Sequence, residues 1–526
     1  MGAVLSMVWE SIRKNRYRLL LLALTLLGLA LRVYRGGAKP LWLDEAFSIW
    51  LGAQPVGAAL GWIVKVDQHP PLYYLLLHLW MGLGDGEATV RLLSALCSTV
   101  TIPVIYLLGK RLGGRSLGLT AALILAVSPF HVQYSQETRM YALLGLTASL
   151  AVYCLLRLLQ DPRAAAMPLG RQLRAGGPLA ARATDLSWLG YILFMAATLL
   201  THNTAIFFPI AVNLWMLGVL AVRRLFPTRC GEGTRFATRT FARNWLIAQG
   251  AVLLLWLPWL PAFYTQSVRV YNEFWIAAPT WSTFTDTWMS FDSAFAPLQA
   301  PLSGLLLLAL GALALAGLRA FRRECSGQAL LLMLIVVPFA GQLLVSLRRP
   351  IFATRTLIWV SVPYYLLLAA GLSELRRVWK GALLVGLVAI NAASLNTLYF
   401  HVEKEGWNQA AAYVAQTAQP GDLILFNATW VEIPFDYYYH RYDRPVEEHG
   451  VPVDLFDRGI LEPKMAESDV PALQQLIAGK SRVWLVYSHN WYTDPQSIIP
   501  RELGQDMRLR SRQSFTGLQV LLYEGK

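Results

Sequence analysis

Long apolar segments, separated by shorter polar gaps, run through the first 400 residues of the chain. A helix needs about 20 apolar residues to cross a membrane, and eleven segments approach that length. They lie at roughly 17–35, 89–109, 116–131, 140–158, 187–201, 203–222, 245–264, 301–319, 327–347, 355–372 and 381–400. The pattern predicts a polytopic α-helical membrane protein, with residues 1–400 as its transmembrane domain.

Basic residues cluster in every second gap between these segments. The clusters run from Arg13 to Arg18, Lys110 to Arg115, Arg163 to Arg182, Arg223 to Arg243, Arg319 to Arg323 and Arg376 to Lys380. Lys and Arg near the ends of spans favour the cytoplasmic side. We therefore expect a multi-pass protein of the inner (plasma) membrane. Its N-terminus is expected to be cytoplasmic, and everything after Phe400 periplasmic or extracellular.

The composition agrees with this class. Of the 526 residues, 55% are hydrophobic and 15% are charged, and the mean hydropathy is +0.42, too high for a soluble enzyme of this size. The net charge of +14 does not indicate nucleic-acid binding, because the basic residues lie between apolar segments rather than on one folded face. The four cysteines lie in predicted spans or basic loops, which indicates no disulfide framework.

The segment 36–88 forms the first predicted outer loop. Its apolar stretches, 46–66 and 72–83, are broken by Pro55 and by the Pro70–Pro71 pair. Stretches of this length, interrupted in this way, favour helices that lie along the membrane surface over two further spans.

Residues 401–526 carry more charge and have no apolar segment of spanning length. Helix and strand patterns alternate in this region. The patterns predict helices over 407–418 and 472–479 and strands over 422–427, 482–488 and 518–524. This alternation predicts a small α/β domain outside the membrane. The domain lacks the glycine motifs GxGxxG and GxxxxGK[ST], which argues against an enzyme that uses ATP or a soluble nucleotide sugar.

Two adjacent carboxylates, Asp44 and Glu45, lie in the apolar sequence LWLDEAFSIW of the first outer loop. Ionisable groups near a membrane are costly and tend to have a function. One carboxylate can act as a general base at the water–lipid boundary while the other orients it, because close like charges raise one pKa. The alternative is a surface helix with two solvated acids, or a helix that begins at Asp44.

A second polar group follows in VDQHPPLYYLLLHLW. Asp67 and His69 are expected to line a cavity, and Tyr73 and Tyr74 suit the headgroup level of a membrane. With Asp44, the first two could instead bind a metal ion. A metal site needs three or four ligands, and the sequence does not show that these residues converge. A divalent metal cofactor is therefore not favoured.

The turn 135–139 brings Glu137 and Arg139 to the outer end of the next span, which begins near Tyr141. One interpretation is a simple ion pair between the two side chains. The other is that Arg139 binds a phosphate group, for which a forked guanidinium is well suited. His202, in the outer turn THNT, is more typical of a hydrogen-bonded turn residue than of a catalyst.

Arg348, Arg349 and Arg355 break the positive-inside pattern at an outer helix end. Contact with lipid headgroups is the simpler explanation for the first two, because long basic side chains can reach along the membrane surface. Arg355 lies inside the next apolar segment and is harder to explain in this way. An anionic partner such as a lipid phosphate is its natural candidate.

These motifs together resemble a known family. Asp44–Glu45, HPPLYY, SQETRMYAL, THNT and the Arg355 segment occur in an order and topology that resemble the GT-C superfamily, membrane glycosyltransferases that use polyprenyl-phosphate sugars. Within it, the chain is similar to the protein O-mannosyltransferases and lipid A aminoarabinose transferases, the PMT or ArnT-like family related to glycosyltransferase family 39. The resemblance covers about residues 1–400, and the pattern GWNQAAAYVAQTAQPGD is familiar from bacterial members with an outer C-terminal domain.

The resemblance implies a GT-C fold with about eleven transmembrane helices and an inverting transfer at the outer face. Asp44 would deprotonate an acceptor hydroxyl, with Glu45 in support, and Arg139 and Arg355 would stabilise the departing lipid phosphate. The other implied site residues are Glu137 and Tyr141 beside the donor phosphate, and Asp67, His69, Tyr73, Tyr74 and His202 in the cavity for acceptor and donor.

The implied partners are a polyprenyl-phosphate-linked hexose or pentose as donor, a lipid, glycan or protein of the cell envelope as acceptor, and membrane lipids. The protein mannosyltransferases carry a further lumenal domain between spans. This chain has no insertion of comparable length, which weakens the case for a protein acceptor.

Two other classes stay open at this point. A lipid or sugar transporter or flippase without transferase activity would show internal repeats and polar or broken spans at mid-membrane. Here the polar residues collect at the outer ends of the spans instead. A non-catalytic scaffold that presents the C-terminal domain is the third class, and in that case Asp44→Asn would change no activity.

Overall fold

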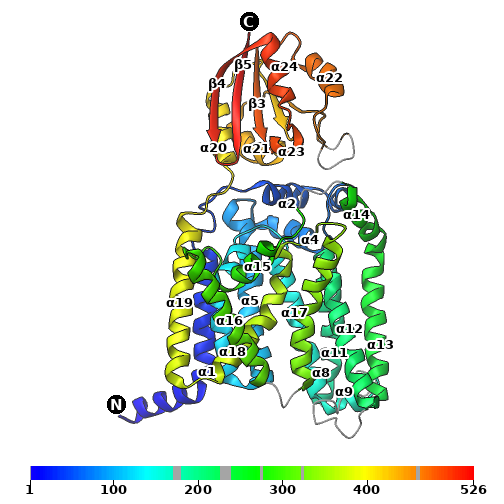
Figure 1. Ribbon diagram of the computed structural model, residues 1–526, viewed down its shortest axis with the longest axis vertical. Coiled ribbons are helices and arrows are strands. Elements are labelled where there is room, and N and C mark those ends of the chain that lie inside the picture. The colour runs from blue at the N-terminus through cyan, green and yellow to red at the C-terminus, as the bar shows by residue number, and fades with distance from the viewer. Residues whose placement is uncertain are drawn as a thin grey trace.

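The computed structural model describes residues 2–169, 179–225, 238–272, 277–320, 325–455, 457 and 463–526. A bundle of long helices carries a smaller sheet domain at one end, which we call the domain side (Figure 1). The opposite end is the far side. The bundle helices are α1 (Gly2–Val33), α5 (Glu87–Gly113), α6 (Arg115–Val127), α7 (Pro129–Ser135), α8 (Tyr141–Gln160), α11 (Leu179–Leu199), α12 (Phe207–Leu225), α13 (Arg239–Trp256), α14 (Leu260–Asn272), α16 (Ala300–Ala320), α17 (Cys325–Ser346), α18 (Ser361–Ser373) and α19 (Arg377–Phe400).

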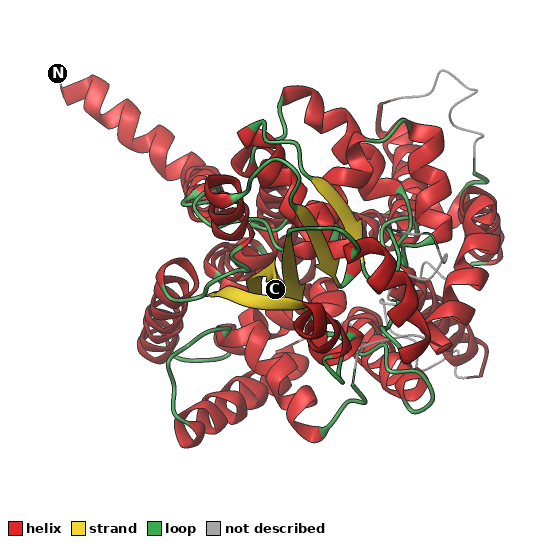
Figure 2. Ribbon diagram, turned by 90° about the horizontal axis from the view of Figure 1, so that it is seen from above, coloured by secondary structure: helices red, strands yellow, loops and turns green. Residues whose placement is uncertain are grey.

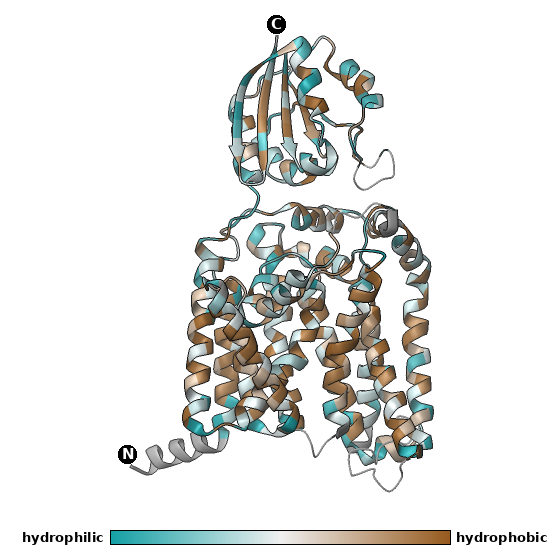
Figure 3. Cartoon of the chain, in the orientation of Figure 1, coloured by the Kyte–Doolittle hydropathy of each residue, from teal (hydrophilic) through white to brown (hydrophobic). Residues whose placement is uncertain are grey.

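Each of the eleven predicted spans falls on a helix of this bundle. Among the described residues, eight helices are long and apolar enough to cross a membrane, one of them α18 together with the preceding 3₁₀ helix η5 (Thr354–Val360). A ninth results if α6 and α7 count as one bent span. The remaining two predicted spans, 17–35 and 187–201, lie on α1 and α11. Apolar residues extend along the length of the bundle (Figure 3). The chain is a multi-pass membrane protein.

The bend between α6 and α7 measures 57° and has a local cause. Pro129 is the first residue of α7, where its missing N–H costs nothing. The side chain of Ser128 accepts a hydrogen bond from the backbone N–H of His131 and so begins the new helix. The bend turns the chain so that the segment after Ser135 reaches the domain side, where it contributes Arg139 to the site described below.

Two glycines allow α16 and α18 to pack with their backbones in close contact. A Cβ atom at Gly317 would lie 2.0 Å from the carbonyl oxygen of Leu367, and one at Gly371 would lie 2.0 Å from that of Leu313. Small residues at such crossings permit close helix packing inside a membrane. Helix α18, which follows η5 and its Arg355, is therefore packed closely against the bundle.

Short helices cover the domain side of the bundle. They are α2 (Leu43–Ala53), α3 (Val56–Lys65) and α4 (Leu72–Trp80), with 11, 10 and 9 residues. Each is too short to span a membrane, which takes about 20 residues. Pro55 and Pro71 stand immediately before α3 and α4, so the breaks expected from these prolines are confirmed. A fourth helix, α15 (Trp281–Ser293), also lies on this side (Figure 1).

Residues 401–526 form a five-stranded sheet with the order β2-β1-β3-β5-β4. The strands β1, β2 and β3 run parallel, and β5 pairs antiparallel with both β3 and β4. Two apolar cores cover its two faces, one with α20 and α21 and one with α22 and α24. The elements are α20 (Trp407–Thr417), β1 (Leu423–Asn427), α21 (Glu432–Tyr439), β2 (Glu447–Gly450), α22 (Val470–Ile477), β3 (Arg482–Ser488), α23 (Asn490–Thr493), α24 (Ile498–Asp506), β4 (Met507–Phe515) and β5 (Leu518–Gly525).

The three predicted strands are confirmed as β1, β3 and β5, and the predicted α/β class is correct. The sequence did not reveal β2 and β4, for a physical reason. Both are edge strands with exposed, polar residues, as in MRLRSRQSF of β4, so neither shows the buried apolar run of an inner strand. Seen from the domain side, the sheet lies over the helix bundle (Figure 2).

The sheet domain is joined to the start of α2 by side-chain hydrogen bonds. The backbone N–H of Leu41 donates to the Tyr438 hydroxyl at 2.8 Å, and that of Leu43 donates to Glu405 Oε2 at 3.0 Å. The Tyr437 hydroxyl donates to the carbonyl oxygen of Asp85 at 2.9 Å. These bonds fix the domain relative to the first loop of the bundle.

The close contact of α16 and α18 makes Gly371→Ala destabilising. The added Cβ cannot avoid the Leu313 carbonyl unless the two helices separate, and overpacking of this kind costs about 1–3 kcal/mol. Thermal unfolding of the purified protein in detergent should show a lower Tm than that of the wild type. Gly304→Ala on α16, where a Cβ meets no atom within 4 Å, is the control and should not lower Tm. Equal Tm values for the two variants would contradict this packing.

Candidate active site

Asp44 and Glu45 lie in the first turn of α2. Acidic side chains are favourable there, because they face the positive end of the helix dipole. Successive residues of a helix point about 100° apart. The two carboxylates therefore enter different surroundings: Glu45 is fully buried, whereas the Asp44 side chain is 29% exposed.

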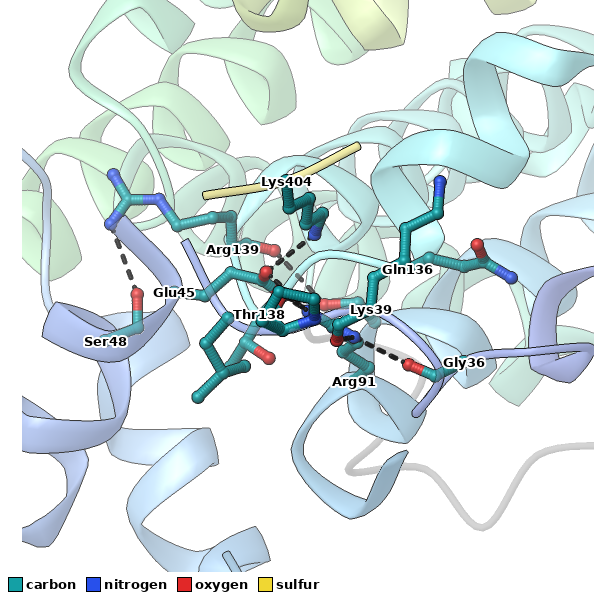
Figure 4. Close-up of polar contacts among 12 residues, drawn as sticks. Gly36, Lys39, Glu45, Ser48, Arg91, Gln136, Thr138, Arg139 and Lys404 are labelled. Atoms are coloured by element: carbon teal, nitrogen blue, oxygen red, sulfur yellow. Dashed lines mark hydrogen bonds and ion pairs between the residues drawn. The ribbon is translucent and has the colours of Figure 1, made fainter. Parts of the chain in front are cut away.

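Glu45 is the centre of a buried ion cluster. Arg91 binds its two carboxylate oxygens, with Nε and Nη2 each at 2.8 Å, and Lys404 Nζ lies 2.6 Å from Oε2. The backbone N–H of Thr138 also donates to Oε1 at 2.9 Å (Figure 4). Burial alone would raise the pKa of Glu45, but the charges of Arg91 and Lys404 outweigh it and lower the pKa to about 2. Glu45 is therefore ionised at neutral pH.

Arg91 extends this cluster to the segment before α2. Its Nη1 donates to the carbonyl oxygens of Gly36 and Lys39, and its Nη2 donates to that of Pro40. The residues that lead into α2 are thus bonded to the same guanidinium that binds Glu45. This arrangement sets the start of α2 in place and, with it, the position of Asp44.

A cavity of about 370 Å³ opens beside Asp44 on the domain side. Its charged lining consists of Asp44, Asp67, Arg139, Arg349 and Arg355. Its apolar lining comes mainly from the domain-side ends of α12, α14 and α17 and from nearby loops. Apolar side chains in this part include Ile206, Phe207, Phe263, Val345 and Ile351. The cavity therefore has a charged part and an apolar part, which suits a ligand with an anionic group and a hydrocarbon chain.

Arg139 and Arg355 converge on the Asp44 carboxylate. Asp44 Oδ2 lies 3.4 Å from Arg355 Nη1 and 3.8 Å from Arg139 Nη2. Arg139 Nη1 is positioned by the Asp44 carbonyl oxygen, Ser48 Oγ and the Tyr74 hydroxyl, at 3.2 to 3.4 Å. Its Nε is buried and has no hydrogen-bond partner among the described residues. Two guanidiniums are thus presented to one carboxylate at the edge of the cavity.

The lining of the cavity carries an excess of one positive charge. Three arginines face two carboxylates, and burial lowers the pKa of His202 well below its usual value, helped by the charges of His69, Arg355 and Arg139. An anionic group is therefore favoured inside. Electrostatic attraction of this kind is strong where water is largely excluded.

Asp67, His69 and His202 form a polar wall of the cavity. His69 Nδ1 lies 2.9 Å from Asp67 Oδ1, and the rings of His69 and His202 are 5.0 Å apart. The His202 Nδ1 accepts from the backbone N–H of Thr204. Burial would raise the pKa of Asp67, but the His69 ring and Arg139 outweigh it and lower the pKa. The three residues predicted to share a cavity do lie together.

The tyrosines take different places. Tyr141 lines the cavity, and the Arg355 guanidinium carbon lies 5.6 Å from the centre of its ring. Tyr73 and Tyr74 are fully buried behind the cavity, where Tyr73 bonds Ser94 and Tyr74 accepts from Arg139. Neither is exposed at headgroup level and neither lines the cavity, unlike the expectation from the sequence.

Two acidic residues do not lie where the sequence interpretation expected. Glu45 does not line the cavity and bonds Arg91 and Lys404 rather than a base. Glu137 is buried, and no hydrogen bond or ion pair joins it to Arg139 among the described residues. Burial raises the pKa of Glu137 to about 7. Neither side chain lines the cavity.

Four residues at or beside the cavity are not among the site residues predicted from the sequence. Arg349 lines the cavity although its position suggested contact with lipid headgroups, whereas Arg348 is exposed outside it. Arg91 and Lys404 bind Glu45, and Trp430 reaches the cavity from the C-terminal domain. Only Arg349 carried a signal, since it breaks the positive-inside pattern.

One set of potential metal ligands lies elsewhere. Among the described residues, Asp436, His440 and Glu448 bring ligand atoms within 4.8 Å of one another, in the C-terminal domain and outside the cavity. This group includes none of Asp44, Asp67 and His69, the residues of the alternative metal site. No cofactor is established for the protein.

Comparison with known proteins gives two kinds of match. The sequence profile of the family described as dolichyl-phosphate-mannose-protein mannosyltransferase matches residues 68–171, which include His69, Glu137, Arg139 and Tyr141. No curated protein sequence matches the chain. The family match covers only part of the chain, but it includes much of the polar site.

Solved structures match almost the whole chain. The ArnT protein of Cupriavidus metallidurans, in its apo state, is 15% identical with a TM-score of 0.60, and the match covers 97% of this chain and 98% of that one. Its structure bound to undecaprenyl phosphate is 16% identical with a TM-score of 0.56, and the match again covers 97% of this chain and 98% of that one. An oligosaccharyltransferase of Archaeoglobus fulgidus is 12% identical with a TM-score of 0.58, and the match covers 98% of this chain and 75% of that one.

At sequence identities this low, the structural similarity shows a shared fold. It confirms that the chain has the GT-C fold of membrane glycosyltransferases, and it agrees with the resemblance seen in the sequence motifs.

Glu45→Gln should destabilise the protein strongly, because it leaves Arg91 and Lys404 buried without their countercharge. Breaking a buried ion pair in this way costs about 3–5 kcal/mol. Thermal or denaturant unfolding in detergent measures the change. The control is Glu374→Gln on the far side, where the side chain is exposed and about 0.5 kcal/mol or less is expected.

The pH dependence provides a second readout of the same cluster. The pKa of Glu45 lies at about 2 in the folded protein, below its ordinary value of 4.5. Its contribution to stability is therefore present above pH 4.5 and is lost as the pH falls toward 2. The wild type should lose more stability than Glu45→Gln over this interval. Parallel pH profiles for both proteins would contradict an ionised Glu45.

Proposed function

We propose that the protein transfers a sugar from a polyprenyl-phosphate donor to an acceptor hydroxyl, with inversion at the anomeric carbon. The observation that carries this proposal is the position of Asp44. Its carboxylate stands between two guanidiniums, Arg139 and Arg355, at the edge of a cavity with one charged and one apolar part. A base and the cations for a leaving phosphate are thus adjacent.

The donor fits the two parts of the cavity. Its phosphate binds Arg139 and Arg355, and its hydrocarbon chain follows the apolar lining around Phe207 and Phe263 toward the membrane. The undecaprenyl phosphate bound to the C. metallidurans protein, which shares this fold, is a ligand of the same class. Guanidiniums bind phosphate oxygens with two parallel hydrogen bonds, which fixes the orientation of the anomeric carbon.

Phosphate binding also prepares the base. In the structure, Asp44 Oδ2 lies 3.4 Å from the Arg355 guanidinium and 3.8 Å from that of Arg139. A phosphate that takes over these contacts releases the Asp44 carboxylate to accept a proton from the acceptor hydroxyl. The base then becomes free only when the donor is in place.

The acceptor oxygen forms a bond to the anomeric carbon as the bond from that carbon to the phosphate oxygen breaks. The hydroxyl proton moves to Asp44, and the lipid phosphate leaves with one additional negative charge. Arg139 and Arg355 stabilise that charge more in the transition state than in the bound donor, which is the condition for acceleration.

The polar wall offers hydrogen bonds to sugar or acceptor hydroxyls. The Asp67–His69 pair and neutral His202 face the same cavity, and Asp67 Oδ2 is buried without a hydrogen-bond partner among the described residues. A buried acceptor atom of this kind favours a ligand that can donate to it. We assign these residues to binding and Asp44 to proton transfer.

The domain side is proposed to be the outer face of an inner or plasma membrane. Basic residues at helix ends on the far side, such as Lys110, Arg223, Arg319 and Arg376, correspond to cytoplasmic positions under the positive-inside rule. The C-terminal domain and Asp44 are then periplasmic or extracellular. The acceptor is a lipid, glycan or protein of the cell envelope, and the transferred group is a hexose or pentose.

Asp44→Asn should abolish transfer without abolishing donor binding, because the amide cannot accept the hydroxyl proton. Removal of a general base costs about 10²–10⁴-fold in rate. Transfer from a panel of radiolabelled polyprenyl-phosphate sugars measures the first effect, and binding of undecaprenyl phosphate measures the second. Asp286→Asn, an exposed aspartate of α15 on the same side, is the matched control. A rate of sugar transfer in Asp44→Asn equal to that of the wild type would contradict the proposal.

Arg355→Ala should weaken both donor binding and transfer, because one of two phosphate-binding guanidiniums is lost. A charge-stabilising donor of this type contributes about 10²–10³-fold to the rate. The control is Arg348→Ala, which removes a nearby arginine that is exposed and does not line the cavity. Binding of undecaprenyl phosphate, followed at several salt concentrations, separates the two. Equal affinities for both variants would show that the phosphate binds elsewhere.

A further inference from the structure

Trp430 is a part of the cavity that the proposed reaction does not yet use. Among the described residues that line the cavity, it alone comes from the C-terminal domain. It is 6% exposed, so other parts of the protein cover most of its surface. An aromatic side chain from a separate domain that lines a partly polar cavity can bind an amphipathic ligand.

The position of Trp430 in the sheet domain favours ligand binding. It lies in the 3₁₀ helix η6 (Thr429–Val431), directly after the carboxyl end of β1. The neighbouring parallel strand β3 ends at Ser488, and the His489 ring that follows lies 6.4 Å from the Trp430 ring. In open α/β sheets, ligands bind beyond the carboxyl ends of parallel strands. This edge of the sheet adjoins the cavity.

Trp430 also carries a hydrogen-bond donor without a partner. The indole N–H of Trp430 is buried and has no hydrogen-bond partner among the described residues. Leaving such a group unbonded is unfavourable for the folded protein. A second buried donor without a described partner, Trp42 Nε1, belongs to the residue before α2, whose ring lies 5.9 Å from the Arg355 guanidinium carbon. Both donors suit a ligand rich in hydroxyl groups.

Trp430 is fixed relative to Asp44. Leu43, the residue before Asp44, packs against the same apolar cluster of the C-terminal domain that contains Trp430. Glu405 Oε2 accepts hydrogen bonds from the backbone N–H of Leu43 and from Trp407 Nε1, at 3.0 and 2.6 Å. The indole is therefore held in a set position beside the proposed base, as binding residues must be.

We propose that Trp430 forms a carbohydrate-binding subsite in which a sugar ring lies against the indole and a sugar hydroxyl accepts from its N–H, with His489 beside it. This inference rests on the proposed function and names a binding surface for it. The ligand is a sugar ring next to the bond that forms. It belongs either to the transferred sugar of the donor or to a sugar of the acceptor.

The test uses the full-length protein in lipid nanodiscs and three variants. Trp430→Ala removes the ring and the N–H, and Trp430→Phe keeps a ring without the N–H. Trp491→Ala removes a tryptophan of the same domain that is 66% exposed and does not line the cavity. Equal Tm values for all variants show that the fold is intact. The probes are undecaprenyl phosphate alone and the same lipid carrying mannose or arabinose.

The expected result depends on which sugar occupies the subsite. For the donor sugar, Trp430→Ala loses about tenfold or more in affinity for the sugar-bearing lipid, with unchanged affinity for the bare lipid, a change of about 1.4 kcal/mol. For an acceptor sugar, donor affinity stays unchanged and the KM for lipid A, a glycolipid acceptor, rises by a similar factor. Trp430→Phe should fall between Trp430→Ala and the wild type in whichever readout changes.

Two results would overturn the subsite while leaving the proposed function intact. In one, a wild type that transfers sugar keeps its donor affinity and its acceptor KM in Trp430→Ala. In the other, Trp430→Ala weakens the bare and the sugar-bearing lipid equally. A wild type that transfers no sugar and binds all lipid probes with the same affinity would instead contradict the proposed function, and the subsite with it.

Discussion

The buried carboxylate of Glu45 joins three parts of the chain that are far apart in sequence. Arg91, 46 residues away, belongs to α5 of the bundle, and Lys404, 359 residues away, belongs to the segment that leads into the C-terminal domain. A charge removed from water is tolerated only when its partners match it closely. The start of α2 is therefore held against both the bundle and the C-terminal domain, and the position of Asp44 follows from this.

The neighbouring carboxylates have different tasks because their environments differ. Glu45 points inward to Arg91 and Lys404 and stays ionised, whereas Asp44 reaches the cavity and shares Arg139 and Arg355. The contacts of Asp44 are longer than those of Glu45 and partly exposed, so they are easier to exchange for an incoming phosphate. The buried ion cluster of Glu45 therefore lies next to the more exposed contacts of the proposed base, Asp44.

Hydropathy and charge placed the membrane helices, since each predicted span falls on a helix and the three apolar strands were found. The same patterns could not separate Asp44 from Glu45, because the face of a helix that is buried depends on partners elsewhere in the chain. Arg91 lay within a predicted span without any visible partner, and Trp430 is 386 residues from Asp44 along the chain. Long-range contacts of this kind leave no local period in a sequence.

We propose that a lipid phosphate replaces Asp44 as the partner of Arg139 and Arg355. A cryo-electron microscopy structure of the protein with undecaprenyl phosphate tests it directly. We predict phosphate oxygens at about 2.7–3.2 Å from both guanidiniums, with the Asp44 carboxylate turned away from them and toward the acceptor side of the cavity. A phosphate bound away from these arginines, with Asp44 still paired to both, would contradict this replacement.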